Sequence, residues 1–142
     1  LFRAKLIGEV YPELSRYLRD NADAPTNVVT LTGRVRGGVT FCQAHNTPFQ
    51  GLAADGAKLA LWKLLKARYR LVGFVHDEVL IELPIDADHT AEAERIDGIM
   101  CSTMQELTGA VPIACEYALS SMWSKQAEAV FTEDGKLIPW ET

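Results

Sequence analysis

Residues 71–84, with the sequence LVGFVHDEVLIELP, constrain the fold of this chain more than any other stretch. Two apolar arms, rich in Val, Leu and Ile, flank the polar residues His76, Asp77 and Glu78, and such arms favour β-strands over helix. Pro84 ends the second arm, because proline has no N–H to donate to a β-ladder. The stretch therefore predicts an antiparallel β-hairpin that carries the three polar residues at or beside its tip.

The chemistry of this tip has two interpretations. Two adjacent carboxylates repel each other, and a divalent cation held by their hard oxygen atoms would remove the repulsion. The alternative is an ordinary hairpin whose acidic tip is simply solvated. Three residues are a weak match to any motif, so the tripeptide by itself favours the solvated tip.

The length and composition are those of one ordinary globular domain. A chain of 142 residues can bury a core but is too short for two comfortable domains. Apolar residues make up 48% and charged residues 23%, which is typical of such proteins. No apolar run approaches the roughly 18 residues that span a membrane, and no secretory signal is visible. We therefore expect a cytoplasmic, intracellular protein with no membrane contact.

The three cysteines, Cys42, Cys101 and Cys115, are widely spaced and form no CxxC pair. This pattern predicts reduced, buried thiols, and it argues against a disulfide framework or a zinc site. The first residue is Leu1 and not Met, which suggests a piece of a longer protein.

Charge is distributed unevenly along the chain. Residues 1–70 hold eleven Lys and Arg against five acids, and the rest holds three against fourteen. A basic half suits a polyanionic partner, and an acidic half suits solvation or metal binding. Two solvated faces of opposite sign are the alternative, so the charge pattern permits nucleic acid without requiring it.

Periodicity predicts the remaining elements. Helices are predicted at 3–19 (interrupted by Pro12), 52–68 and 88–107. Strands are predicted at 27–32, 39–42 and 111–119, with a turn at 33–38 and an irregular tail at 120–142. The fold class is therefore expected to be α+β, with an antiparallel sheet from about 71 to 119 that packs on the second and third helices.

Several segments, in this order, resemble family A DNA polymerases, the polymerase I type. Residues 46–55, NTPFQGLAAD, resemble the N-x-P-x-Q-G-x-A-A-D segment of that family, and residues 75–78, VHDE, resemble its motif C. Residues 111–123 resemble the last strand of the palm with its closing tryptophan, and residues 11–14 resemble an upstream helix. The resemblance spans about residues 5–124 and favours a metal-binding hairpin over a solvated one.

The resemblance implies a DNA-directed DNA polymerase, a nucleotidyltransferase that extends a primer with deoxynucleotides in DNA replication or repair. Asp77 would be one of two carboxylates that hold the two catalytic Mg²⁺ ions. Glu78 would be a neighbouring acid with a lesser role, and His76 would lie against the primer terminus.

The resemblance also implies DNA contacts away from the hairpin. Asn46 and Gln50 would contact DNA near the newly formed base pair, and Arg34 loosely matches an arginine of the family. The implied partners are primer–template DNA and deoxynucleoside triphosphates, so the protein would be DNA-associated.

Two motifs of the family are absent from the 142 residues: the D-Y-S-x-I-E-L type metal motif and the fingers helix that holds the incoming nucleotide. We therefore expect residues 1–142 to form one unit, the C-terminal portion of a polymerase palm. Within it, residues 1–70 would be helical and lie on the fingers/palm side, 71–124 would hold the palm hairpin, helix and strand, and 125–142 would be a tail. The isolated chain would be inactive, and it would need the missing N-terminal half from a parent chain or a second polypeptide.

Two other functions remain open. One is a non-catalytic module for nucleic-acid binding or assembly that derives from a polymerase and works with a partner chain. The other is an unrelated metal-dependent hydrolase built on the hairpin. That hydrolase would need further ligands, and His45 and His89 show no ligand-like spacing.

Overall fold

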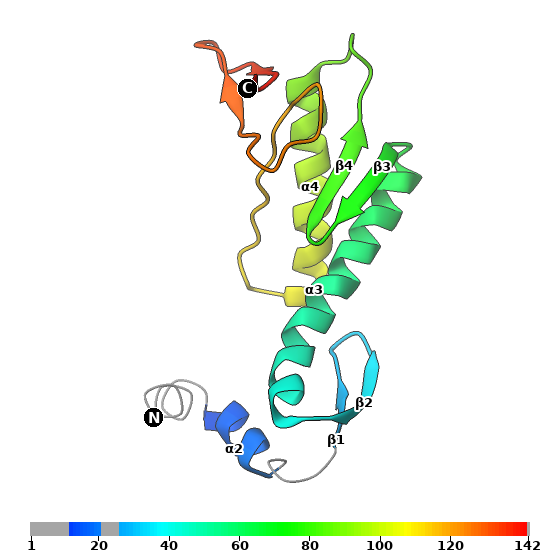
Figure 1. Cartoon of the computed structure of the whole chain (residues 1–142), viewed down its shortest axis with the longest axis vertical. Helices are drawn as coiled ribbons and strands as arrows, with labels where there is room; N and C mark the ends of the chain where they lie inside the picture. The colour runs from blue at the N-terminus through cyan, green and yellow to red at the C-terminus, as the bar shows by residue number, and fades with distance from the viewer. Residues whose placement is uncertain (1–11, 21–25, 142) are drawn as a thin grey trace. The chain divides into compact units, whose positions relative to one another are not determined.

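The computed structural model describes residues 12–20 and 26–141, and the chain divides into two compact units, Leu1–Asp55 and Gly56–Thr142 (Figure 1). Helices and antiparallel strand pairs are both present, so the predicted α+β class is confirmed. No helix among the described residues is both long and apolar enough to cross a bilayer. In chain order the elements are α2 (Pro12–Asp20), β1 (Thr26–Val29), β2 (Val35–Val39), α3 (Phe41–Lys66), β3 (Arg70–Val75), β4 (Glu78–Glu82), α4 (His89–Thr108), β5 (Val130–Phe131) and β6 (Leu137–Ile138).

The helix predicted over residues 3–19 is described from Pro12 onward, where α2 begins. Its earlier part lies outside the described residues. Proline is well tolerated at the first helical position, because the N–H that it lacks would have no partner there. Pro12 therefore starts a helix at this position, as the sequence pattern allowed.

In the first unit, β1 and β2 pair antiparallel. A hydrogen bond from the Gly33 N–H to the Thr30 carbonyl (2.9 Å) closes the turn between them, and Gly33 has φ 85°, which favours glycine. The predicted turn at 33–38 and return strand at 39–42 are therefore wrong. The chain turns earlier, and β2 already ends at Val39.

Helix α3 begins at Phe41, whereas the sequence pattern predicted a helix over 52–68. Thr40 and Gln43 make one of the two hydrogen bonds of a capping box at this end, in which the Gln43 side-chain oxygen accepts from the Thr40 N–H (3.0 Å). Pro48 lies inside the helix, where proline usually costs about 3 kcal/mol. Residues 41–51, which precede the predicted helix, are therefore helical as well.

Packing explains why this segment is helical. Ala44, in the first turn of α3, forms a buried cluster with Val28 of β1 and Val39 of β2. Thr47 is also buried, and its hydroxyl donates to the Gln43 carbonyl (2.6 Å), so this buried polar group has a partner. This burial stabilises the first turns of the helix against the strand pair, and it offsets the tendency of Pro48 to interrupt a helix.

In the second unit, the predicted hairpin and the helix that follows it are confirmed. Strands β3 and β4 pair antiparallel, and Val75 lies opposite Glu78. Helix α4 begins after Asp88, whose carboxylate accepts a hydrogen bond from the Ala91 N–H (3.1 Å), and it ends at Gly109 with φ 65°.

The predicted strand at 111–119 is wrong. This segment is extended, and its residues alternate between exposed and half-buried, but it joins no ladder apart from a single bridge that follows it between Ser120 and Trp140. The sheet predicted from about 71 to 119 is therefore only the two-stranded pair β3–β4, and it does not reach residue 119. Alternating side chains can cover a helix without a neighbouring strand, so a period of two does not by itself give a ladder.

The tail also differs from the sequence-based prediction. Residues predicted to be irregular contain the strand pair β5–β6. Leu137 of β6 is buried, and its N–H donates to the Thr90 hydroxyl of α4 (2.9 Å). This contact attaches the tail to the start of α4.

The core of the second unit lies between α3 and α4. Leu64 of α3 and Thr103 of α4 are fully buried, and the Thr103 hydroxyl donates to the Ile99 carbonyl (2.6 Å). Gly56 is also buried, and a Cβ placed on it would meet the end of the Met104 side chain at 2.5 Å. The absence of a side chain at Gly56 therefore allows α4 to pack closely here.

Candidate functional site

The hairpin tip carries its three polar residues in a tight geometry. His76 and Asp77 form the two-residue turn between β3 and β4, and both are exposed. His76 has φ 57°, a left-handed value that is uncommon for residues other than glycine and that suits the twist of a two-residue hairpin. Glu78 is the first residue of β4 and is half-buried. The turn therefore presents Asp77 to solvent on a defined backbone.

A long-range hydrogen bond orients Glu78. The indole Nε1–H of Trp123 donates to Glu78 Oε1 at 3.0 Å, across 45 positions of the chain. One oxygen of this carboxylate is engaged, so Glu78 Oε2 and both oxygens of Asp77 are the carboxylate atoms left at the tip. These are hard oxygen ligands, which suit Mg²⁺.

The tip by itself supplies only part of a metal site. Within the described part of the chain, Asp77 and Glu78 do not belong to any group of three side chains whose ligand atoms lie together. Two adjacent carboxylates are too few to hold two ions, which usually need an acid from another element as well. The donor chemistry fits a hard cation, but the site would have to be completed by other groups.

The first unit gathers the other three predicted site residues in one pocket of about 330 Å³. Asn46 and Gln50 lie four residues apart on α3 and therefore share a face of the helix. Arg34 comes from the turn that precedes β2. The full lining is Arg34, Val35, Arg36, Asn46, Thr47, Gln50 and Gly51.

Arg34 is held by an acid. Its Nε donates to Asp55 Oδ1 at 2.9 Å, its Nη2 contacts the same oxygen, and the Thr32 hydroxyl donates to Asp55 Oδ2. The hydrogen bond to Asp55, followed by the charge of that carboxylate, raises the pKa of Arg34 above its usual value. Asp55 therefore attaches the turn that contains Arg34 to helix α3, and its carboxylate offsets the positive charge of Arg34.

Arg36 also lines the pocket, although it is not among the predicted DNA-contact residues. Its Nη1 donates to the Thr47 hydroxyl at 3.3 Å, and among the described residues it forms no ion pair. Arg36 lies two positions after Arg34, and this proximity is the sequence signal that points to it. The pocket therefore combines one uncompensated guanidinium with two amide side chains, a set that hydrogen-bonds to phosphates and base edges.

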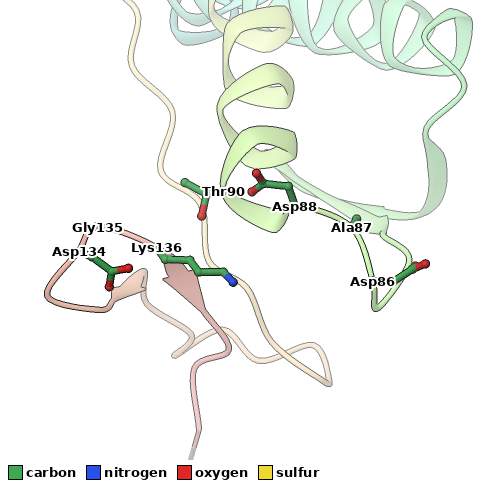
Figure 2. A pocket seen from close by; sticks show the side chains of 7 residues that line it. All are labelled: Asp86, Ala87, Asp88, Thr90, Asp134, Gly135 and Lys136. Atoms are coloured by element: carbon green, nitrogen blue, oxygen red, sulfur yellow. The ribbon is translucent and has the colours of Figure 1, made fainter.

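A second hollow, of about 550 Å³, lies in the other unit and was not predicted. Figure 2 shows that its lining comes from the loop before α4, from Thr90 at the start of α4, and from the turn between β5 and β6. Two of its three acids have local roles: Asp88 caps α4, and a hydrogen bond from Thr132 lowers the pKa of Asp134. We assign no site to this hollow.

The cysteines differ from the sequence-based prediction. All three are free thiols, as predicted, but Cys42 is exposed, and Cys101 and Cys115 are only half-buried. The Sγ atoms of Cys101 and Cys115 lie 3.5 Å apart, although the residues are 14 positions apart in the sequence. Desolvation is the largest cause that raises the pKa of the Cys101 thiol to about 12, and contacts with Cys115 and Asp97 add to it.

Comparison with known proteins gives one consistent relationship. No family model matches the sequence, and no solved structure matches the chain. The chain is 30% identical over 116 residues to the DNA polymerase I of Synechocystis sp., and this match covers 78% of this chain and 11% of that protein. It is 32% identical over 115 residues to the DNA polymerase I of Bacillus caldotenax, 76% of this chain and 12% of that protein. It is 33% identical over 135 residues to the DNA polymerase I of Deinococcus radiodurans, 80% of this chain and 13% of that protein. The chain thus spans 11 to 13% of the length of these relatives.

Proposed function

We propose that this chain, which is related to DNA polymerase I, is the C-terminal portion of the palm of such a polymerase and takes part in template-directed primer extension. The observation that carries the proposal is the hairpin tip. Two adjacent carboxylates lie at this tip: Asp77 is exposed in the two-residue turn, and Glu78, the first residue of β4, is oriented by the indole of Trp123. A match over three quarters of the chain includes its middle, where this hairpin lies.

Each residue of the tip has a role in this proposal. Asp77 would hold catalytic Mg²⁺ together with a carboxylate from outside the 142 residues, and the ions would stabilise the attacking and leaving oxygens of nucleotidyl transfer. Trp123 keeps the Glu78 carboxylate in one orientation beside that ligand. His76, exposed in the same turn, would contact the primer terminus.

The pocket of the first unit would bind DNA. Asn46 and Gln50 would hydrogen-bond to the duplex near the newly formed base pair, because amide groups both donate and accept at base edges. Arg34 is engaged by Asp55, so in this proposal it mainly positions the turn. Arg36 would be the guanidinium that contacts a phosphate, since no carboxylate among the described residues offsets its charge.

A chimeric polymerase tests the proposal. The corresponding segment of the Deinococcus radiodurans DNA polymerase I is replaced by this chain, and primer extension is measured with Mg²⁺. Loss of a metal carboxylate removes stabilisation of developing charge, so Asp77→Asn should lower kcat by about 10³-fold, equivalent to about 4 kcal/mol.

Glu94→Gln is the matched control, because Glu94 is an exposed acid of α4. This variant should stay within about twofold of the parent chimera. A folded chimera that binds primer–template DNA but does not extend it, or one whose activity is unchanged by Asp77→Asn, would contradict the proposal.

The isolated 142 residues are proposed to be inactive, because they contain neither the D-Y-S-x-I-E-L type metal motif nor the fingers helix that holds the incoming nucleotide. The alternative function is a non-catalytic nucleic-acid-binding module. The pocket of the first unit favours it, because the Arg36 guanidinium there forms no ion pair with a described residue. Mixing the chain with an N-terminal polymerase fragment that carries the two missing motifs distinguishes the two. A catalytic portion restores extension in such a mixture, whereas a binding module stays inert in it.

A further inference from the structure

The strongest feature outside the proposed polymerase site is a cluster of three side chains in the second unit. Asp97 and Cys101 lie four positions apart on α4 and therefore point from the same face of the helix. Cys115 lies on the extended segment after Gly109, which runs back along α4 (Figure 1). The structure thus joins two ligand-type residues of a helix with a third from a neighbouring segment.

We propose that Asp97, Cys101 and Cys115 form a binding site for one thiophilic divalent cation of the zinc class. This site is separate from the polymerase chemistry and does not depend on the proposed function. It departs from the sequence-based expectation that the widely spaced cysteines form no zinc site.

The distances support one ion. The Cys101 Sγ lies 3.5 Å from the Cys115 Sγ and 3.3 Å from Asp97 Oδ1, and all three ligand atoms lie within 4.8 Å of one another. In a tetrahedral zinc site with the usual bond lengths, two sulfurs are about 3.8 Å apart and a sulfur and an oxygen about 3.6 Å apart. The ligand atoms therefore already lie near the edges of such a tetrahedron, and the fourth position is left for water.

The surroundings also favour a cation. No Lys, Arg or His among the described residues forms an ion pair with Asp97, whose carboxylate is half-buried and contacts the Cys101 thiol. A metal would balance this charge. Binding would exchange the two thiol protons for two metal–sulfur bonds, so two protons go to solvent and no oxidant is needed.

A Cys101–Cys115 disulfide is the competing chemistry. A disulfide needs the sulfurs at about 2.05 Å, so they would have to approach by about 1.5 Å. It would also give Asp97 no role, although its carboxylate lies against the pair. The geometry therefore favours a shared ion over a covalent bond.

The site would have a structural consequence. The extended segment around Cys115 joins no ladder, so a metal bond there would attach it to α4 at its middle. The segment leads to Trp123, which orients Glu78. An ion at this site would therefore stabilise the course of the chain between α4 and the hairpin.

The test uses the reduced, metal-free 142-residue chain, titrated with Co²⁺ and then with Zn²⁺. We expect one ion per chain, a thiolate-to-cobalt charge-transfer absorption, and displacement of Co²⁺ by Zn²⁺. Zinc affinity should fall at least 100-fold in Cys101→Ser and in Cys115→Ser, and at least tenfold in Asp97→Asn. Cys42→Ser is the matched control and should bind as the parent does, because Cys42 is an exposed cysteine of the first unit.

Three results would overturn the proposal. One is zinc binding that is unchanged in all three ligand variants, and another is binding that is lost in Cys42→Ser. The third is a reduced chain that binds no zinc, whether or not it forms the disulfide in air. If a serine variant does not fold by circular dichroism, Asp97→Asn decides, since it keeps both thiols and changes only the carboxylate.

Discussion

The substitution Gly51→Ala tests how the first unit holds Arg34 in place. Gly51 lies in α3, and a Cβ added there would meet the Thr30 Cγ2 at 2.6 Å. Carbon atoms in contact normally lie at about 3.5–4.0 Å, so the new methyl group would overlap Thr30 by about 1 Å. In an open helix position the same change would be favourable by about 1 kcal/mol.

Thr30 cannot yield without cost. It is only 4% exposed and β-branched, so it has few alternative rotamers. Its Oγ1 accepts a hydrogen bond from the Arg34 N–H (3.1 Å) and lies 2.8 Å from the Thr32 hydroxyl. Overpacking costs about 2 kcal/mol, and loss of one of these hydrogen bonds about 1 kcal/mol. After the helical gain, we expect the unit to lose about 2 kcal/mol of stability.

Hydrogen exchange of the β1 and β2 amides measures this loss directly, because it reports on the local unit. A cost of about 2 kcal/mol corresponds to exchange about 30-fold faster. Gly98→Ala in α4 is the matched control, since a Cβ there would meet nothing within 4 Å, and it should stabilise its helix. Thr30→Ser removes the overlapping methyl group and keeps Oγ1, so it should restore most of the lost protection in the Gly51→Ala background.

Two results would refute this reasoning. Gly51→Ala could slow exchange as Gly98→Ala does in its own helix, which would mean that the overlap costs nothing. Alternatively, Thr30→Ser could fail to recover protection, which would mean that Thr30 is not the obstacle. The double-mutant cycle separates the pairwise effect from the two single ones.

Three further predictions concern the second unit. Tyr69→Phe removes the hydrogen bond to Glu92 (2.6 Å) and should cost about 1 kcal/mol in urea unfolding at neutral pH. Burial, followed by this hydrogen bond, raises the pKa of Tyr69 above 10.0. The unfolded chain therefore loses this proton at a lower pH than the folded chain does, so the stability of the folded chain should fall as the pH rises beyond 10.0. The phenylalanine variant should lack this part of the decline. His76→Gly relieves a φ of 57° and should raise the stability of the hairpin by about 1 kcal/mol in the same assay, and no change would show that the turn is unstrained. Trp123→Phe removes the donor to Glu78 and should lower the kcat of the chimeric polymerase more than its affinity for DNA; equal losses of both would contradict the orienting role.

Local signals in the sequence were sufficient for the hairpin and for α4. The hairpin follows from two apolar arms and a terminating proline, and the tip residues His76 and Asp77 lie where the pattern placed them. The limits of α4 follow from Asp88, which caps its start, and Gly109, which ends it. These features depend on residues within a few positions of one another, so they can be read without the fold.

The start of α3 shows where local reading fails. The residues around Pro48 have turn composition, and the helix forms because Ala44 is buried against β1 and β2. A capping box at Thr40 and Gln43 was the signal that could have placed the helix start correctly. The prediction for residues 111–119 is wrong for the opposite reason, because this segment has strand composition but no neighbouring strand to pair with.

The sequence by itself determined the hairpin, its acidic tip and the limits of α4, because each depends on contacts between near neighbours in the chain. Only the tertiary structure decided that Asp55 holds Arg34, that Trp123 orients Glu78 and that Cys101 meets Cys115. These contacts join residues 14 to 45 positions apart. Their partners are selected by packing of whole elements, which no periodicity in the sequence encodes.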